Sequence, residues 1–386
     1  MRLLAISWQP LSPVHSGYRQ RVVELYGELA KRMEVLVIVP GDSGGAPFAR
    51  DIQVPSSWRG SLPKGRLWET FSPGFREEAA KIAREWKPDR VLAEGLWAVS
   101  AAKSAAQATG VPLGITVQNI EYLSARGVYP PPIPSALRVY ERRVYRRADW
   151  LVAITEEERE TLHEVLGGKC PPILVVPNGT TTPSSPPEKI RVEQIRKSWG
   201  IRPEEEVVLF LGNMNYPPNL KGLAWFSKEV YPLLPKEASG VRWIAVGEPI
   251  PSEPVHPFEF VGFMGDLDAA CAAADVAISP IRHGSGTSIK VLDLLGRGLP
   301  IVATPESIRG LAGTENAGVR VGGTPNEFAH RLLELLKNEG ERERQGVLGK
   351  RWVAANRDWK TIAERFSNDL KEGDASPGSS FPQSSF

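Results

Sequence analysis

The chain has 386 residues, of which 41% are hydrophobic and 8% aromatic, which is enough for two domains that each bury a core. This composition excludes a small disulfide scaffold, a coiled coil and a disordered chain. Lys and Arg number 47 and Asp and Glu 45, so the formal net charge is only +2. A general surface for nucleic acid is therefore not expected, and any anionic partner must bind at a local site.

Cysteine content and targeting signals suggest a compartment. Cys170 and Cys271 are the only cysteines, so we expect neither a disulfide framework nor a cysteine-based metal site, and a reducing compartment. The apolar run at residues 3–6 is too short for the core of a signal peptide, and no run of about 18 apolar residues follows. These features predict a cytoplasmic protein.

In the first half of the chain, short apolar runs alternate with helix-period segments, as in a parallel sheet built from βαβ units. Apolar positions recur every three or four residues from Tyr18 to Met33 and predict an amphipathic helix. Further helices are predicted after Leu96, over 136–147 and after Ile154. Strands are predicted at 3–7, 35–39, 90–93, 113–117, 151–154 and 173–176. Residues 1–182 therefore form one predicted Rossmann-like domain.

The second half repeats the pattern after a break. Residues 180–187 read Thr-Thr-Thr-Pro-Ser-Ser-Pro-Pro and predict an inter-domain linker, so 183–204 is assigned to the linker and a connecting helix. A second Rossmann-like domain is predicted over 205–350, a C-terminal helix over 351–371 and a disordered tail over 372–386. Its strands are predicted at 207–211, 243–246, 258–261, 276–279 and 301–303. The fold class is α/β, with two doubly wound domains facing a central cleft.

The most informative motif follows the strand that ends at Ser279. A glycine-containing loop leads into a helix that begins near Ser288, and helix N-termini present N–H groups that suit a phosphate. Arg282 and Lys290 add cations, and the Asp293 carboxylate could accept a hydrogen bond from a sugar hydroxyl. The alternative is a tight turn with Ser288 as N-cap and no ligand.

Residues 279–304, SPIRHGSGTSIKVLDLLGRGLPIVAT, resemble the donor-binding segment of GT-B glycosyltransferases, in particular the retaining family 4 (group 1) enzymes. Three other segments are similar to that family: TVQNIEYLS, VVPNGTT and LFLGNMNYPPNLKGLAWFSKEVYPLL. The order and spacing agree over roughly residues 1–370. The resemblance implies transfer of a hexose-type sugar from a nucleotide diphosphate donor with retention, and a C-terminal helix that returns to the N-terminal domain.

The resemblance also implies site residues. Lys290 would contact the diphosphate together with Arg282, and Asp293 takes the place of the family's second Glu, at the donor ribose. His283 stands near the place of the first Glu, and Gln118 replaces a His, so both positions depart from the family. The implied donor-binding residues are Asn213, His283, Gly284, Ser285, Gly286, Thr287 and Ser288, and the acceptor-side residues are Ser16, Gly17, Gln118, Asn119 and Glu121.

No metal ion or other cofactor is expected, since the nucleotide sugar is a co-substrate. Fixed cations and a helix N-terminus can stabilise the charge that develops on a departing diphosphate. Asp266-Leu267-Asp268 matches the Asp-x-Asp pattern of metal-dependent glycosyltransferases. We interpret Asp266 instead as the N-cap of the Ala-rich helix that follows it.

Other candidates are open. Gly17 lets its loop border the cleft, although an ordinary βα turn capped by Ser16 is equally consistent. Glu94 and Glu121 are either a general base or acceptor contact, or surface carboxylates. The run Arg138, Arg142, Arg143, Arg146 and Arg147 is either a solvated helix face or a contact for an anionic membrane or lipid-linked acceptor.

Two other functions fit the predicted architecture. A nucleotide-sugar epimerase of GT-B shape would share the fold and the phosphate loop. A two-domain, non-catalytic ligand-binding protein would share the paired α/β domains. The acceptor, whether saccharide, lipid-linked or small molecule, is not specified by the motifs.

Overall fold

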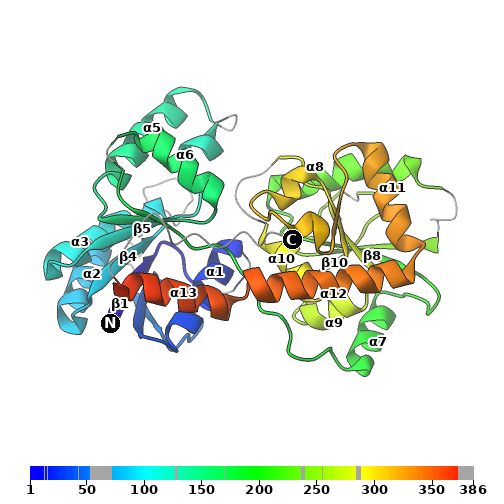
Figure 1. Ribbon diagram of the computed structural model, residues 1–386, viewed down its shortest axis with the longest axis horizontal. Helices are drawn as coiled ribbons and strands as arrows, with labels where there is room; N and C mark the ends of the chain where they lie inside the picture. The colour runs from blue at the N-terminus through cyan, green and yellow to red at the C-terminus, as the bar shows by residue number, and fades with distance from the viewer. Residues whose placement is uncertain are drawn as a thin grey trace. The chain divides into compact units, whose positions relative to one another are not determined.

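The computed structural model describes residues 1–12, 14, 16–41, 43–52, 72–126, 129–168, 170–235, 240–253, 255–283 and 288–372. The chain forms two compact units (Figure 1). The N-terminal unit contains Met1–Asn178 and the segment that begins at Trp359, and the C-terminal unit contains Gly179–Asp358. The chain thus passes between the units twice. The tail predicted to be disordered lies outside the described residues from 373 onward.

The N-terminal unit is built on a seven-stranded parallel sheet with the order β3-β2-β1-β4-β5-β6-β7. The strands are β1 (Arg2–Ser7), β2 (Glu34–Pro40), β3 (Ala49–Ile52), β4 (Arg90–Glu94), β5 (Leu113–Val117), β6 (Trp150–Ala153) and β7 (Ile173–Val175). The helices are α1 (Gly17–Leu29), α2 (Pro73–Trp86), η3 (Leu96–Ala98), α3 (Val99–Thr109), α4 (Glu121–Ala125), α5 (Pro132–Tyr145), α6 (Glu156–Leu166) and α13 (Trp359–Glu372). The six predicted strands are confirmed; β3 and α2 were not predicted.

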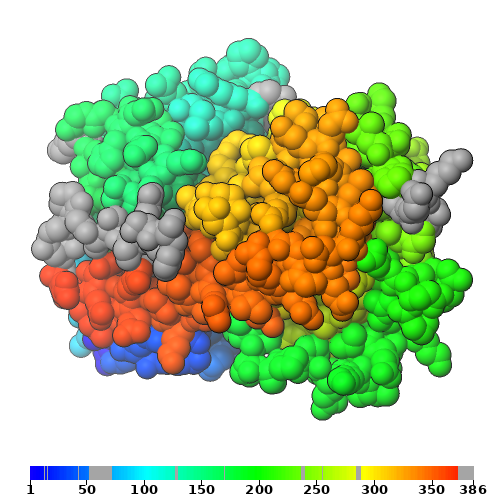
Figure 2. Space-filling view, turned by 45° about the vertical axis from the view of Figure 1, so that its right-hand side comes forward, coloured from blue at the N-terminus to red at the C-terminus, as the bar shows by residue number. Residues whose placement is uncertain are grey.

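Apolar side chains cover both faces of this sheet. One face packs on α2, α3, α5 and α6, with Phe75 and Tyr145 in its core, and the other packs on α1 and α13, with Tyr26 and Trp359 in its core. In Figures 1 and 2 the red α13 lies beside the blue N-terminal segment that contains α1. The predicted return of the C-terminal helix to the N-terminal domain is therefore confirmed.

The C-terminal unit has a six-stranded parallel sheet with the order β10-β9-β8-β11-β12-β13. The strands are β8 (Val207–Leu211), β9 (Arg242–Val246), β10 (Glu259–Gly262), β11 (Val276–Ser279), β12 (Ile301–Ala303) and β13 (Val319–Val321), of which β13 was not predicted. The helices are α7 (Lys189–Ser198), α8 (Pro217–Trp225), η4 (Phe226–Val230), η5 (Tyr231–Leu233), α9 (Leu267–Ala272), α10 (Ile289–Gly296), η7 (Pro305–Ile308), η8 (Thr314–Asn316), α11 (Pro325–Leu336) and α12 (Glu339–Asn356).

Two helix predictions have clear outcomes in this unit. The single helix predicted over 351–371 is wrong, because α12 ends at Asn356 and α13 begins at Trp359. Asp358 between them pairs instead with Thr180 in an isolated parallel bridge, so the break coincides with the second crossing between the units. The predicted cap is confirmed, since the Asp266 carboxylate accepts a hydrogen bond from the Ala269 N–H at 3.1 Å.

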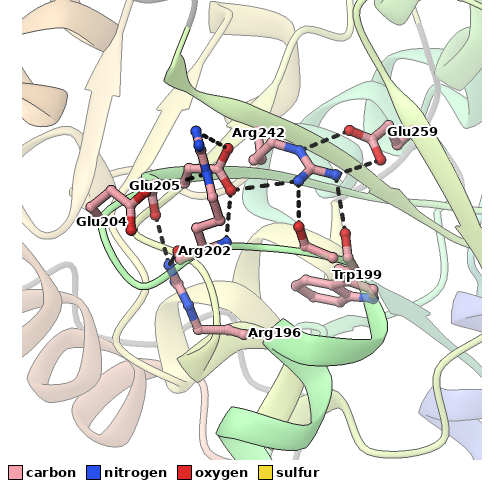
Figure 3. A network of polar contacts seen from close by, with 8 residues as sticks. Arg196, Trp199, Arg202, Glu204, Glu205, Arg242 and Glu259 are labelled. Atoms are coloured by element: carbon pink, nitrogen blue, oxygen red, sulfur yellow. Dashed lines mark hydrogen bonds and ion pairs between the residues drawn. The ribbon is translucent and has the colours of Figure 1, made fainter.

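The amino ends of β9 and β10 are joined by a polar network (Figure 3). The Arg242 guanidinium donates to both carboxylate oxygens of Glu259, at 2.9 and 2.7 Å, and to the carbonyls of Trp199 and Gly200, at 3.0 and 2.8 Å. Glu205 lies 3.6 Å from the same guanidinium. The amino ends of these two strands are therefore held by contacts within the chain.

The first six strands of the N-terminal sheet have the same order as the six strands of the C-terminal sheet. In each sheet the second and third strands are added outward on one side of the first strand, and the following strands are added on its other side. The resulting switch points lie between β1 and β4 and between β8 and β11, and ligands of doubly wound folds bind outside the carboxyl ends of strands at such points. Within the described ranges, every helix is too short or too polar to cross a lipid bilayer.

Candidate functional site

At the switch point of the C-terminal unit, glycines allow unusually close packing. A Cβ at Gly212 would lie 2.6 Å from the Asn219 amide nitrogen, and one at Gly247 would lie 1.8 Å from the Gly212 carbonyl oxygen. A Cβ at Gly222 in α8 would lie 2.7 Å from the carbonyl oxygen of Pro280. Glycine is needed at these positions, and the result is that α8 packs directly against the segment that follows β11.

Lys290 is the central cation of this site. It lies in the first turn of α10, where its Nζ donates to Asn219 Oδ1 at 2.7 Å and lies 4.8 Å from the centre of the Phe210 ring. Asn219 is 4% exposed, and its Nδ2 donates to the Asn213 carbonyl at 2.7 Å. Burial lowers the pKa of Lys290 to about 7. No carboxylate in the described ranges pairs with this amine, so an anionic ligand would be its natural counter-ion.

Ser288, two residues before Lys290, lies at the start of α10. Ser288 occupies the N-cap position, but its buried hydroxyl makes no capping bond and has no hydrogen-bond partner among the described residues. The predicted N-cap position of Ser288 is therefore confirmed, but its side chain does not cap the helix. The first N–H groups of a helix have no intrahelical acceptor, so hydroxyl and backbone together offer donors to an anion.

Arg282 and His283 are both exposed at the other end of the same loop. The Arg282 guanidinium lies 5.1 Å from the centre of the Trp225 ring, so α8 orients it by a cation–π contact. Gly284, Ser285, Gly286 and Thr287, the predicted phosphate loop, lie outside the described residues. Asn213 is exposed at the end of β8, and its Oδ1 accepts from the Asn215 N–H at 2.8 Å.

Asp293, predicted at a donor ribose, lies one turn further along α10 and is only 7% exposed. Its Oδ1 accepts a hydrogen bond from the Thr180 hydroxyl at 2.6 Å and lies 3.6 Å from Arg297. The Thr180 N–H in turn donates to the Arg357 carbonyl at 2.8 Å. The carboxylate thus binds the chain just after its first crossing between the units, a contact that no motif indicated.

At the switch point of the N-terminal unit, the central group is a carboxylate. Glu94, at the end of β4, is 1% exposed, so the alternative of a surface carboxylate is wrong. Three side chains donate to it: Tyr26 at 2.5 Å, Thr116 at 2.9 Å and Gln118 at 2.8 Å. Gln118, predicted on the acceptor side, therefore uses one amide hydrogen to hold Glu94.

Tyr18 closes the top of the same cluster. Its hydroxyl donates to the Glu94 carbonyl at 3.1 Å, lies 2.9 Å from the Ser7 hydroxyl and accepts from the Trp8 N–H at 3.3 Å. Burial, followed by the Glu94 charge, raises the pKa of Tyr18 far above its usual value, so the phenol stays neutral. The predicted Ser16 cap is confirmed, because its hydroxyl accepts from the Arg19 N–H at 3.4 Å. Gly17 is the first residue of α1.

Two carboxyl groups lie near the start of α4, of which Glu141 is buried and Glu121 is partly buried. Glu141 in α5 accepts from the N–H groups of Glu121 and Tyr122, at 2.8 and 3.0 Å, and thereby caps α4. Burial, reinforced by the Glu141 charge and opposed by a hydrogen bond with Trp97, raises the pKa of Glu121 to about 7. Glu121 is therefore suited to exchange a proton near neutral pH. Asn119, two residues earlier, is partly buried.

Two clusters thus contain a part of the predicted site: Lys290 and Asn213 join Asn219 in the C-terminal unit, and Gln118 joins Glu94 in the N-terminal unit. The sequence-based prediction named Lys290, Asn213 and Gln118 but not the residues that contact the predicted ones or Glu94 from other elements, which are Asn219, Phe210, Trp225, Tyr26 and Thr180. In the described ranges no three His, Cys, Asp or Glu side chains are grouped so as to hold a metal ion.

Family comparisons agree with this division. Residues 16–179 match the family model described as "Glycosyl transferase 4-like domain", and residues 205–338 match "Glycosyl transferases group 1". The two matches cover the greater part of both sheets. The chain belongs to the group 1 glycosyltransferases of the GT-B fold.

Two relatives match part of the chain at low sequence identity. The chain is 28% identical over 264 residues to a D-inositol 3-phosphate glycosyltransferase of Kineococcus radiotolerans, a match that covers 60% of this chain and 59% of the relative. It is 23% identical over 178 residues to an uncharacterized 44.6 kDa protein in the cps region of Klebsiella pneumoniae, with 43% of this chain and 45% of the relative covered. The matched part thus spans less than two thirds of either relative.

Solved structures resemble the whole fold. Sucrose-phosphate synthase from Thermosynechococcus elongatus has a TM-score of 0.76 at 15% identity, covering 96% of this chain and 99% of that one. Anabaena HepE in complex with UDP and glucose has a TM-score of 0.74 at 15% identity, covering 96% and 100%. At this identity the likeness establishes the GT-B fold.

Proposed function

We propose that the protein transfers a hexose-type sugar from a nucleotide diphosphate donor to an acceptor hydroxyl, with retention at the anomeric carbon. The observation that carries this proposal is the buried Lys290 amine, which has an amide partner and no carboxylate partner in the described ranges. The Ser288 hydroxyl at the start of the same helix, which has no hydrogen-bond partner among the described residues, supports it. Since the related fold of Anabaena HepE was determined with UDP and with UDP-glucose, UDP-glucose is the first donor to test.

In the proposed reaction, the bond between the anomeric carbon and the diphosphate oxygen breaks while the bond to the acceptor oxygen forms on the same face of the sugar. The acceptor proton passes to the departing phosphate oxygen, so no covalent enzyme intermediate is needed. Lys290, Arg282 and the start of α10 stabilise the charge that develops on the diphosphate. We propose that these groups serve without a bound metal ion.

The acceptor is assigned to the N-terminal unit in this proposal. Glu121, whose pKa is raised to about 7 by burial, is suited to form a hydrogen bond with a hydroxyl group of the acceptor substrate. Asn119 and Gln118 lie just before it, and Ser16 and Gly17 begin α1. The acceptor is a saccharide, a lipid-linked sugar or a small molecule. Cys170 and Cys271 are free thiols, which supports action in the cytoplasm.

The direct test measures nucleotide binding by calorimetry. UDP and UDP-glucose are titrated into the wild type, into Lys290→Met and into Lys221→Met, whose lysine lies exposed on α8 and serves as the matched control. Lys290→Met should weaken UDP binding at least tenfold, and the control should leave it unchanged. Equal affinity for UDP and uridine in the wild type would contradict a diphosphate site.

Product analysis separates the remaining alternatives. A transferase supplied with an acceptor forms a glycoside whose anomeric configuration NMR can compare with that of the donor, and retention predicts the same configuration. An epimerase would convert the nucleotide sugar without any acceptor. A non-catalytic binding protein would leave the donor intact.

A further inference from the structure

A pocket lies in the N-terminal unit, between α3, α5 and the face of β5. It has a volume of about 510 Å³, within the range of about 300–1,000 Å³ that is typical of small-molecule sites. Its walls are largely apolar, formed by Val99, Ala106, Val111, Leu113, Ile115 and Val144. None of the residues of the two clusters described above lines it.

Three cations surround this apolar interior. Lys103 comes from α3, Arg143 from α5 and Arg147 from the turn that follows α5, and all three side chains are exposed. In the part of the chain that the structure describes, none of them forms an ion pair or a side-chain hydrogen bond. The carboxylate of Asp149 also lines the pocket, but it accepts the Leu113 N–H at 2.7 Å and so serves the start of β5. The rim therefore carries three cations and one carboxylate, an excess of positive charge over an apolar cavity.

The surface of α5 also carries exposed apolar side chains. Ile133 is 48% exposed, Val139 68% and Tyr140, which lines the pocket, 37%. Of the neighbouring arginines, Arg146 at the C-cap of α5 donates to the Leu166 carbonyl and Arg138 lies over the Tyr122 ring, whereas Arg142 is exposed. Exposed apolar groups beside free arginines are typical of a helix that lies at the surface of an anionic membrane.

We propose that this pocket binds one acyl chain of an anionic membrane lipid, with the phosphate of the headgroup between Lys103, Arg143 and Arg147. An apolar cavity excludes small inorganic anions as the ligand, and the charged rim excludes an uncharged hydrocarbon. An acyl chain joined to a phosphate satisfies both parts at once. The site would hold the N-terminal unit at a membrane, and it does not depend on the transfer reaction proposed above.

Binding is tested by calorimetry with dodecyl phosphate below its micelle-forming concentration. Dodecyl maltoside, which has the chain without the charge, and butyl phosphate, which has the charge without the chain, should each bind at least tenfold more weakly. Ala106→Phe should fill the cavity, and Arg143→Ser should remove one rim cation. Both should weaken dodecyl phosphate binding at least tenfold, whereas Arg84→Ser, an exposed arginine on α2, should not.

Vesicle flotation then distinguishes the source of the ligand. The wild type should float with phosphatidylcholine vesicles that contain phosphatidylglycerol and not with phosphatidylcholine alone, and Ala106→Phe should abolish flotation. If Ala106→Phe does not fold by circular dichroism, Val144→Phe fills the same cavity from α5. Unchanged flotation by a folded filled variant would overturn the pocket, and binding of dodecyl phosphate without flotation would overturn a membrane source.

Discussion

The two units share the order of six strands, yet the switch point of one contains a carboxylate and that of the other an amine. The two groups also differ in how many of their hydrogen-bonding positions are used. In the N-terminal unit the buried Glu94 carboxylate accepts hydrogen bonds from the side chains of Tyr26, Thr116 and Gln118. In the C-terminal unit the Lys290 amine, which has three hydrogens to donate, forms one hydrogen bond with the described residues, to Asn219. From this comparison we expect the buried charge to serve structure in the N-terminal unit and ligand binding in the C-terminal unit.

This difference follows from general rules of burial. A buried charge with a full set of partners stabilises one arrangement of the chain, and removing a partner leaves it costly. A buried charge with an incomplete set of hydrogen-bond partners retains the capacity to bind a ligand. Until a ligand of opposite charge binds, burial shifts its pKa in the direction that favours the neutral form. The predictions below test whether Glu94 and Lys290 belong to these two classes.

The largest effect is expected for Lys290→Met. Loss of one preorganised donor to a developing negative charge costs about 10²- to 10³-fold in turnover, so hydrolysis or transfer from UDP-glucose should fall by about that factor. The variant no longer buries an amine but leaves Asn219 Oδ1 without its donor, and these two effects on stability oppose each other, so the thermal midpoint is measured in parallel to show that the variant is folded. The matched variant Lys221→Met should keep full turnover. Normal turnover in Lys290→Met would remove the lysine from the site.

The pH dependence of UDP binding should show the same amine. With a pKa of about 7 in the free protein, Lys290 is increasingly neutral above that pH and must take up a proton when the diphosphate binds. The affinity for UDP should therefore fall toward a limit of about tenfold per pH unit between pH 7.5 and 9, and proton uptake should appear in calorimetry with two buffers of different ionisation enthalpy. Lys290→Arg should bind with little pH dependence, because a guanidinium stays charged.

The same shift has a signed consequence for stability. Since burial lowers the pKa of Lys290 from 10.5 to about 7, the unfolded chain binds more protons than the folded one between these values. The free energy of unfolding of the wild type relative to Lys290→Met should therefore rise with pH across this window. Denaturant titrations of both proteins at pH 7 and pH 9 provide the measurement, and a constant difference would contradict the lowered pKa.

Glu94→Gln should have a smaller effect, and on folding first. The new amide presents hydrogens to side chains that already donate, so at least one buried donor loses its acceptor, at a cost of about 1–3 kcal/mol in the free energy of unfolding. UDP affinity should stay at the wild-type value, because this cluster belongs to the other unit. Glu85→Gln, an exposed carboxylate on α2, is the control for loss of charge. A loss of UDP affinity without a loss of stability would reverse the assignment of the two clusters.

Much of the fold was predictable from the sequence because most strands are apolar runs buried on both faces. The predicted bounds of β5, β8, β11 and β12 agree with the structure to the residue. The strands β3 and β13 were missed, since they are short edge strands with the charged residues Arg50, Asp51 and Arg320. The end of α12 was missed because its cause, the bridge between Asp358 and Thr180, joins distant parts of the chain.

The site was predictable only where one segment carries it. Lys290, Arg282 and Ser288 lie within one motif, so their types and spacing indicated a phosphate site. The contact between Lys290 and Asn219 joins residues 71 positions apart, and that between Glu94 and Tyr26 joins residues 68 positions apart. No local pattern encodes such pairs, because they depend on which loops the strand order brings to one edge of the sheet.

The smallest effect on stability is expected at the amino ends of the strands in the C-terminal sheet. There Arg242 joins Glu259 to the carbonyls of Trp199 and Gly200. The Glu259 side chain is 51% exposed, so the ion pair is screened by water, and Arg242→Gln should lower the free energy of unfolding by about 1 kcal/mol. UDP affinity and turnover should be unchanged, because this network lies at the amino ends of β9 and β10 and ligands bind at the carboxyl ends. Denaturant titration and calorimetry on one preparation measure both quantities. If Arg242→Gln weakened UDP binding as much as Lys290→Met, the two edges of the sheet would not be independent, and the division between a structural and a binding edge would fail.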